Sequence, residues 1–256
     1  MKTITVAFVF LATLSFTNTV DTKGREIAQK SIEADQGFES ESVELEMILT
    51  NRQGQVSKRY MTSQIFEMDD DGDKSMIEFN SPKDVKGTKT LTYTHKKGDD
   101  DQWLFLPSIS RVKRISSSNK SGPFMGSEFS FEDLTSFEIE KYTHEFIKED
   151  VLNGDKVAIV AQVPTYKKSG YSKRLVYMNM DKDYRFEKIE YFDRKGEKLK
   201  TLDYKGYQQY LGKFWRADLL EMVNHQNGKK TSLKFTNYKF KTGASENDFS
   251  QSSLRN

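Results

Sequence analysis

The chain has 256 residues, no cysteine and 30% charged residues, and its formal net charge is +2 at pH 7. Acidic and basic residues are interspersed, so the composition excludes the large basic surface that nucleic-acid binding requires. A chain without disulfides must be stable through its hydrophobic core alone, and roughly 235 residues are enough for one sizeable β domain.

The first 20 residues have the pattern of an export signal. Lys2 supplies a positive start, an apolar run covers 4–16, and small or polar residues follow. The run is too short to cross a bilayer, so the pattern predicts a cleaved signal peptide at 1–20. Because the run is cleaved and too short to span, we expect no membrane-spanning segment, and because no cysteine follows it, we expect no lipid anchor at the cleavage site. Export of a cysteine-free chain favours the periplasm.

One helix is expected at the start of the mature chain. Thr22 can cap it, Ile27, Ala28 and Ile32 share one side, and Gly37 can end it. The apolar side is narrow, so the helix is expected to pack against a larger element.

After Gly37 the hydrophobic period changes from helical to two, which is typical of strands. The breaks between the runs carry turn residues, such as Asn153-Gly154-Asp155. We expect a single domain over 21–256, built as an antiparallel meander that curls into a strongly curved sheet or incomplete β-barrel. The expected strands are 43–49, 56–66, 76–79, 88–95, 102–106, 111–116, 137–149, 156–163, 171–179, 185–193, 197–210, 213–224 and 229–240.

No motif predicts catalysis, a metal or a cofactor. His95, His144 and His225 lie far apart, without the short spacing of zinc ligands, and a satisfied or exposed strand histidine is the better interpretation. No nucleophile elbow or glycine-rich phosphate loop occurs. The acidic segment 67–78 copies part of a calcium loop, but its strand-like flanks favour a hairpin turn. We therefore expect no enzyme.

Two neighbouring segments are the candidate binding residues. Residues 103–107 (WLFLP) form a strand that is apolar on both faces, so either the protein's own core or a ligand covers each face. Residues 124–134 (FMGSEFSFEDL) fit neither a helix nor a clean strand. They can fold over a cavity as a flap or fill the curved sheet as permanent core. The predicted cavity or flap residues are Trp103, Phe105, Phe124, Met125, Phe129 and Phe131.

Cations follow the apolar strand directly. Arg111 and Arg114 are the predicted rim, placed to meet the anionic head group of an amphiphile. The alternative is a rim of long side chains that cover apolar surface while keeping their charges in water.

These segments resemble the LolA-like family, the outer membrane lipoprotein-sorting proteins of Gram-negative bacteria. The resemblance covers most of the mature chain and is most specific in its central block. The matching pieces are 82–88 (PKDVKGT), 103–107 (WLFLP), 111–116 (RVKRIS), 126–134 (GSEFSFEDL), 191–196 (YFDRKG) and 215–222 (WRADLLEM).

The resemblance implies an incomplete antiparallel β-barrel beside a helix, with a hydrophobic cavity on the concave side. It also implies a periplasmic carrier that shelters acyl chains of lipoproteins or lipids on the way to the outer membrane. The alternative is an accessory or interaction module of an inner-membrane RND-type exporter of lipids or other hydrophobes. A monomer is expected in either case.

Overall fold

A computed structural model describes residues 22–255, so the predicted signal peptide lies outside the described residues. Helix α1 (Thr22–Asp35) precedes a single 13-stranded sheet within this range. The strands are β1 (Ser40–Thr50), β2 (Val56–Phe66), β3 (Lys74–Ser81), β4 (Lys89–Tyr93), β5 (Asp101–Leu106), β6 (Arg111–Arg114), β7 (Tyr142–Leu152), β8 (Asp155–Pro164), β9 (Tyr171–Asn179), β10 (Phe186–Asp193), β11 (Lys198–Tyr210), β12 (Phe214–Asn224) and β13 (Lys230–Phe240).

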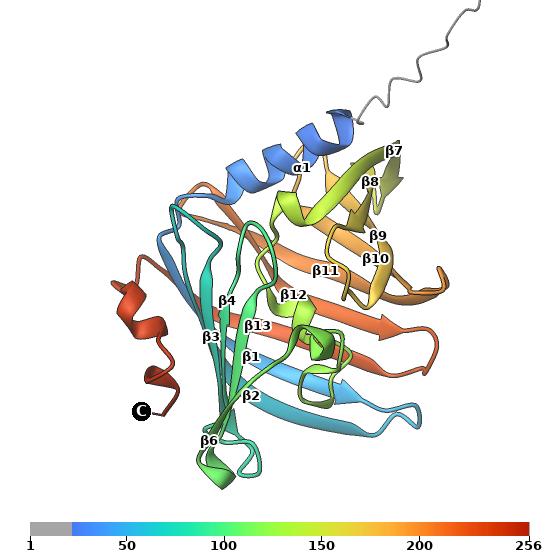
Figure 1. Ribbon diagram of the computed structural model, residues 1–256. Coiled ribbons are helices and arrows are strands. Elements are labelled where there is room, and N and C mark those ends of the chain that lie inside the picture. Colours follow the sequence, from blue (N-terminus) through green and yellow to red (C-terminus); the bar gives the residue numbers. More distant parts are fainter. Residues whose placement is uncertain (1–21, 256) are drawn as a thin grey trace, which may run out of the picture.

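The sheet is antiparallel throughout and runs in the order β6-β5-β4-β3-β2-β1-β13-β12-β11-β10-β9-β8-β7. Strand β1 pairs with both β2 and β13, and so joins the half of the sheet formed by β2–β6 to the half formed by β7–β13. The sheet curves strongly without closing, so β6 and β7 remain as its two edges (Figure 1). The expected incomplete antiparallel barrel is confirmed.

Helix α1 lies across one end of the curved sheet (Figure 1). The buried Gly24 lets the helix lie directly against the backbone of β7. A Cβ at this position would stand only 2.7 Å from the backbone nitrogen of Phe146. At the other end of the helix, the Arg216 guanidinium on β12 donates to Asp35 and to Glu41 of β1, both at 2.6 Å. Gly37 then adopts a φ of +94°, which favours glycine, and ends the helical path.

Residues 115–141 connect the two edges of the sheet, since β6 and β7 are consecutive in the chain. We call them the crossover segment. They contain only short 3₁₀ turns, among them η3 (Phe124–Gly126), η4 (Phe131–Leu134) and η5 (Ile139–Lys141). Figure 1 shows the crossover segment inside the curve of the sheet. The prediction that a strand begins at 137 is wrong, because 137–141 still belong to this crossing and β7 starts at Tyr142.

The outer face of β3–β6 is covered by the last residues of the chain, which the sequence patterns left unassigned. Phe249 and Leu254 are buried against Leu91 and Trp103 there, and form a second, smaller core. The Tyr93 hydroxyl donates to the Phe249 carbonyl at 2.6 Å, which fixes this C-terminal segment on the sheet.

Candidate functional site

The concave face of the sheet is the apolar surface that the crossover segment and α1 cover. Strand register places Leu45 of β1 opposite Met61 of β2 on one side and opposite Phe235 of β13 on the other. Met61 in turn lies opposite Phe79 of β3. Because side chains alternate between faces, these residues share the inner face with the rest of the large core.

The phenylalanines of the crossover segment fill part of this concave face. Phe124 is 1% exposed, and its ring centroid lies 5.8 Å from that of Phe79 and 5.5 Å from that of Phe131. Phe129 and Phe131 are buried in the same core. The segment therefore packs as core in this conformation, and the contacts that hold it in place decide whether it can also act as a flap.

One buried ion pair anchors the crossover segment to the sheet. Asp133 accepts a hydrogen bond of 2.6 Å from Lys200 of β11, and both side chains are only 4% exposed. The same carboxylate accepts from Ser130, in a capping box, and from the Tyr171 hydroxyl of β9 at 2.8 Å. Lys200 also donates to the Glu128 carbonyl at 2.9 Å. The segment is thus tied to β9 and β11 by charge-assisted hydrogen bonds.

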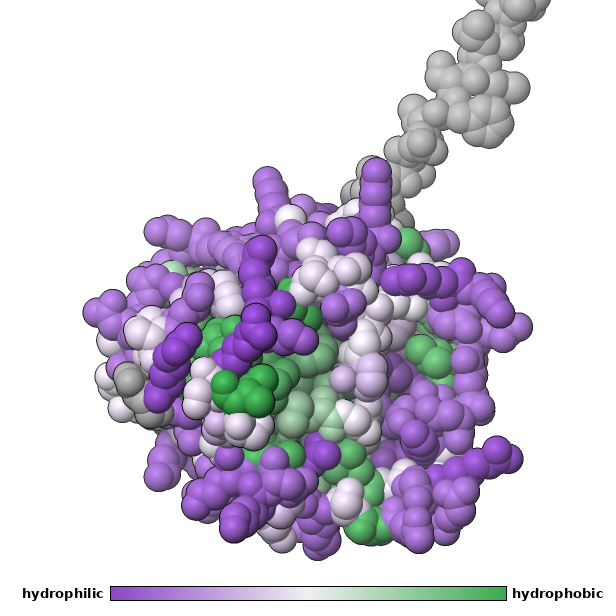
Figure 2. Space-filling view, turned by 60° about the horizontal axis from the view of Figure 1, so that its bottom comes forward, coloured by the Kyte–Doolittle hydropathy of each residue, from purple (hydrophilic) through white to green (hydrophobic). Residues whose placement is uncertain are grey.

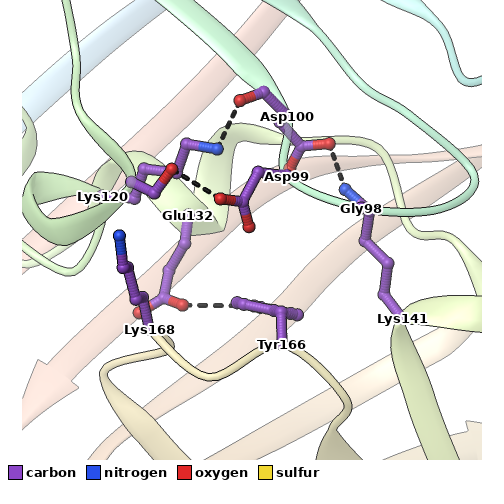
Figure 3. A pocket seen from close by; sticks show the side chains of 9 residues that line it. Gly98, Asp99, Asp100, Lys120, Glu132, Lys141, Tyr166 and Lys168 are labelled. Atoms are coloured by element: carbon purple, nitrogen blue, oxygen red, sulfur yellow. Dashed lines mark hydrogen bonds and ion pairs between the residues drawn. The ribbon is translucent and has the colours of Figure 1, made fainter.

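A small polar pocket lies where the crossover segment meets two loops of the sheet (Figure 3). Lys141 pairs with Asp100 of the β4–β5 loop, and Lys120 donates to the carbonyl of the same residue. Tyr166 of the β8–β9 loop donates to Glu132 at 3.2 Å. The free space is only about 10 Å³, far too little for an alkyl chain. These contacts fasten the two sides of the open barrel to the segment between them.

Two carboxyl groups that titrate near neutral pH lie at the end of the crossover segment: Glu138 within the segment, and Asp73, which directly precedes β3 and contacts the segment. Burial raises the pKa of Asp73, which accepts from Ser136 at 3.0 Å, to about 6. Burial and the neighbouring Asp73 raise the pKa of Glu138 to about 7. Because the folded state holds these protons more tightly than the unfolded chain, their contribution to stability is fully present below about pH 4 and is lost as the pH rises from there to about 7.

A cavity of about 330 Å³ opens between the crossover segment and the sheet. Gly126 and Glu128 line one side of it, and Leu49 and Thr231 of the concave face line another. The remaining wall is the largely polar end of the β1–β2 hairpin, Thr50, Asn51, Gln55, Val56 and Ser57. Lys229 and Lys230 lie on its rim. The Glu128 amide donates to the Thr231 hydroxyl at 3.0 Å, so the segment rests directly on β13 at this opening.

Figure 2 shows the molecule from the end of the sheet that lies away from α1. Apolar side chains gather in the middle of this face, and hydrophilic side chains surround them. A contiguous exposed apolar area of this kind is typical of an interaction or ligand-binding surface. No helix among residues 22–255 is long and apolar enough to cross a membrane.

The structure divides the predicted apolar site residues between two faces. Phe124, Phe129 and Phe131 are in the concave core, and Met125 packs against it. Trp103 and Phe105 instead belong to the outer core beneath the C-terminal segment, so they do not meet the other four. One face of their strand is therefore covered by the protein's own core, one of the two possibilities left open by its doubly apolar pattern.

The two predicted rim cations also point to opposite faces, because they are three residues apart on one strand. Arg111 lies opposite Leu106 and shares its inner side. Arg114 lies opposite Trp103 on the outer side and pairs with Asp101. The structure does not bring them together at one rim.

Sequence reasoning missed several residues that shape the concave face. Lys200 and Asp133 form its buried ion pair. Tyr191 of β10 is paired with Lys200 of β11 on one side and with Arg174 of β9 on the other, so Arg174 also faces inward. A charged residue at an inward position of a period-two strand was a usable signal for Lys200 and Arg174. The partner in the crossover segment had no such pattern.

The three histidines serve different contacts. His144 is buried on β7 and hydrogen-bonded, as a satisfied strand histidine should be. His95 follows β4 and pairs with Asp71 and Asp101. His225 contacts the Thr201 hydroxyl at 2.7 Å.

Known proteins of similar sequence and fold were identified. A family model with the description "Uncharacterized protein" matches residues 71–256. A crystal structure named as an outer membrane lipoprotein-sorting protein domain from Vibrio parahaemolyticus is 49% identical, with a TM-score of 0.90, over 92% of this chain and 100% of that one. No curated protein matches.

Two further structures extend the comparison. A DUF1329 family protein from Desulfovibrio piger is 26% identical, with a TM-score of 0.86, over 92% of this chain and 99% of that one. A LolA superfamily protein from Nitrosomonas europaea is 17% identical, with a TM-score of 0.72, over 90% and 98%, and supports the fold alone. The chain therefore belongs to the same family as the outer membrane lipoprotein-sorting protein domain from Vibrio parahaemolyticus, and its fold is LolA-like.

Proposed function

We propose that this protein is a periplasmic carrier that binds the acyl chains of lipoproteins or lipids on the concave face of its sheet. Export through the signal peptide at 1–20 and a single domain over 21–256 are part of this proposal. The observation that supports it most is the apolar concave face covered by the crossover segment, beside which a cavity of about 330 Å³ opens at the hairpin ends. The relation to a lipoprotein-sorting domain supports the same role.

The physical task is to remove the cost of exposing an alkyl chain to water. That cost is about 0.8 kcal/mol per methylene, so a sixteen-carbon chain costs on the order of 12 kcal/mol. An apolar face under a displaceable segment can offset this cost without bond making. We therefore assign binding and release to the protein, and no catalysis.

The alkyl chain would enter at the cavity beside Gly126 and displace crossover side chains from the concave face. Of the predicted residues, Phe124, Met125, Phe129 and Phe131 are proposed to give way to the chain. Trp103 and Phe105 are left out, because they pack on the outer face. The half-buried Leu220 of β12, opposite Leu233, would form part of the surface beneath.

Two adjacent leucines on β12 offer a matched test. Leu220 faces the concave core, and the equally half-buried Leu219 faces outward between Lys205 and Lys234. We expect Leu220→Glu to weaken binding of a fluorescent fatty-acid probe at least about tenfold, because it places a charge beside the alkyl chain. Leu219→Glu should bind as the wild type does.

Thermal unfolding should be measured for both variants, to separate loss of binding from loss of fold. Equal binding by both folded variants would remove the concave face as the site. The alternative role, docking onto an RND-type exporter, needs no chain in this face, and a wild-type protein that takes up no probe would favour it.

A further inference from the structure

Arg174 of β9 is a half-buried cation on the concave face that lacks an acidic partner. No carboxylate among residues 22–255 lies within 4 Å of its guanidinium, in contrast to Lys200, which pairs with Asp133. Its Nη2 is buried and has no hydrogen-bond partner among the described residues. Buried charges are nearly always paired, so a guanidinium in this state indicates an anionic partner supplied from outside the chain.

A chain of buried hydrogen bonds holds this guanidinium in place. Its Nε donates to Gln162 Oε1 at 2.7 Å, so the amide nitrogen of Gln162 faces His144 Nδ1 at 3.2 Å. The His144 Nε2–H then donates to the Ile139 carbonyl at 2.9 Å. Burial lowers the pKa of His144, which keeps the imidazole neutral and the chain intact. The cation is therefore positioned in advance, and two of its donor groups remain for a ligand.

Two further tyrosines of the concave face are neighbours of Arg174. Tyr191 is its cross-strand partner on β10, and Tyr204 of β11 lies within electrostatic range. No described residue hydrogen-bonds to the hydroxyl of either one. Burial raises the pKa of both phenols, so each keeps its proton and can donate it to an anion. Tyr142 packs on the guanidinium face, 3.9 Å from its ring centroid.

Apolar side chains continue from this cluster along the concave face. Phe186 lies 6.2 Å from Tyr204, ring centroid to ring centroid, and Leu220 is directly opposite Tyr204 on β12. Phe235 of β13 follows on the same face. All four are only partly buried. A ligand with an anionic head at Arg174 could therefore lay an alkyl tail across β10–β13.

We propose that Arg174, with the hydroxyls of Tyr191 and Tyr204, binds the anionic head group of an amphiphile, a carboxylate or a phosphate. This inference rests on the proposed carrier function and names its ligand class. The Phe137 ring of the crossover segment covers the guanidinium, 5.2 Å from its centroid, so the head group reaches Arg174 when that end of the segment moves. The predicted rim cations Arg111 and Arg114 have no part in this site.

The test compares ligands of one chain length that differ in head group. Dodecanoate, dodecyl phosphate and neutral dodecanol compete against a fluorescent alkyl probe. We expect the two anions to bind about tenfold to a hundredfold more tightly than dodecanol, the range of a charged hydrogen bond. Arg174→Gln should remove that preference and leave dodecanol unchanged, whereas Arg174→Lys keeps part of it. Arg111→Gln, an exposed control, should change nothing.

Each other outcome has a distinct meaning. Equal wild-type affinity for dodecanoate and dodecanol would overturn the head-group site and leave the carrier function standing. This comparison uses the wild-type protein alone, so it does not depend on whether a variant folds. Binding of inorganic phosphate or acetate as tightly as the amphiphiles, with the same dependence on Arg174, would mean a free-anion site and overturn the assignment. If none of the three dodecyl compounds binds, the carrier function itself is refuted.

Discussion

A disulfide that joins the crossover segment to β13 should reduce alkyl-chain binding by more than about a hundredfold, because the lock removes the displaced state that binds. Glu128→Cys with Thr231→Cys is the natural pair. The Glu128 amide and the Thr231 hydroxyl are 3.0 Å apart, so the two Cα atoms are within disulfide reach. The chain has no other cysteine to interfere. Binding of a fluorescent fatty acid, measured before and after reduction, gives the effect within one protein.

Reduction should restore binding, which separates the lock from the two substitutions. A control disulfide on the outer face, Glu221→Cys with Ser232→Cys, joins directly opposite residues of β12 and β13 without touching the segment. It should leave binding intact. If the oxidised lock binds the probe as well as its reduced form does, the crossover segment is permanent core and the chain binds elsewhere.

Lys200→Met should lower the free energy of unfolding by about 3–5 kcal/mol, because it leaves the Asp133 carboxylate buried without its cation. Both side chains are 4% exposed, so water cannot replace the lysine without opening the structure. Chemical denaturation measures the loss. Hydrogen exchange of the Lys200→Met protein should be accelerated, relative to the wild type, more in the crossover segment than in the strands, since this pair anchors the segment to β11.

Lys205→Met is the matched control on the same strand. Lys205 pairs with Glu221 on the outer face, where both side chains are exposed, and its removal should cost less than about 1 kcal/mol. Adding Asp133→Asn to Lys200→Met should cost less than the sum of the two changes, because the uncompensated charge is gone. A Lys200→Met protein as stable as Lys205→Met would show that the pair does not hold the segment.

The strands were readable from the sequence because their signal is local. All thirteen expected runs correspond to strands, and the bounds of β2 (Val56–Phe66) and β9 (Tyr171–Asn179) were predicted to the residue. Alternation of apolar and polar residues, broken by turns such as Asn153-Gly154, is sufficient for this. The number of strands predicted the curvature and the capping residues predicted the helix, while the family resemblance added the hydrophobic cavity on the concave side.

Long-range placement was not readable in the same way. Trp103 and Phe124 look alike in sequence, yet the C-terminal segment covers one face of β5 and the crossover segment the other. The face of a strand follows from its parity, but which segment covers that face depends on sheet order. Because β6 and β7 are opposite edges, the chain between them must cross the sheet, and in the structure it does so on the concave side. This crossing becomes apparent only once the strand order is known.

Native mass spectrometry of the mature protein, purified from the periplasm without detergent, tests the central claim most directly. The account predicts that part of the wild-type population carries a bound lipid or acylated species, and that Leu220→Glu loses it while Leu219→Glu keeps it. A wild-type protein that is found only at its bare mass, and that stays there after incubation with fatty acids and phospholipids, would contradict the account.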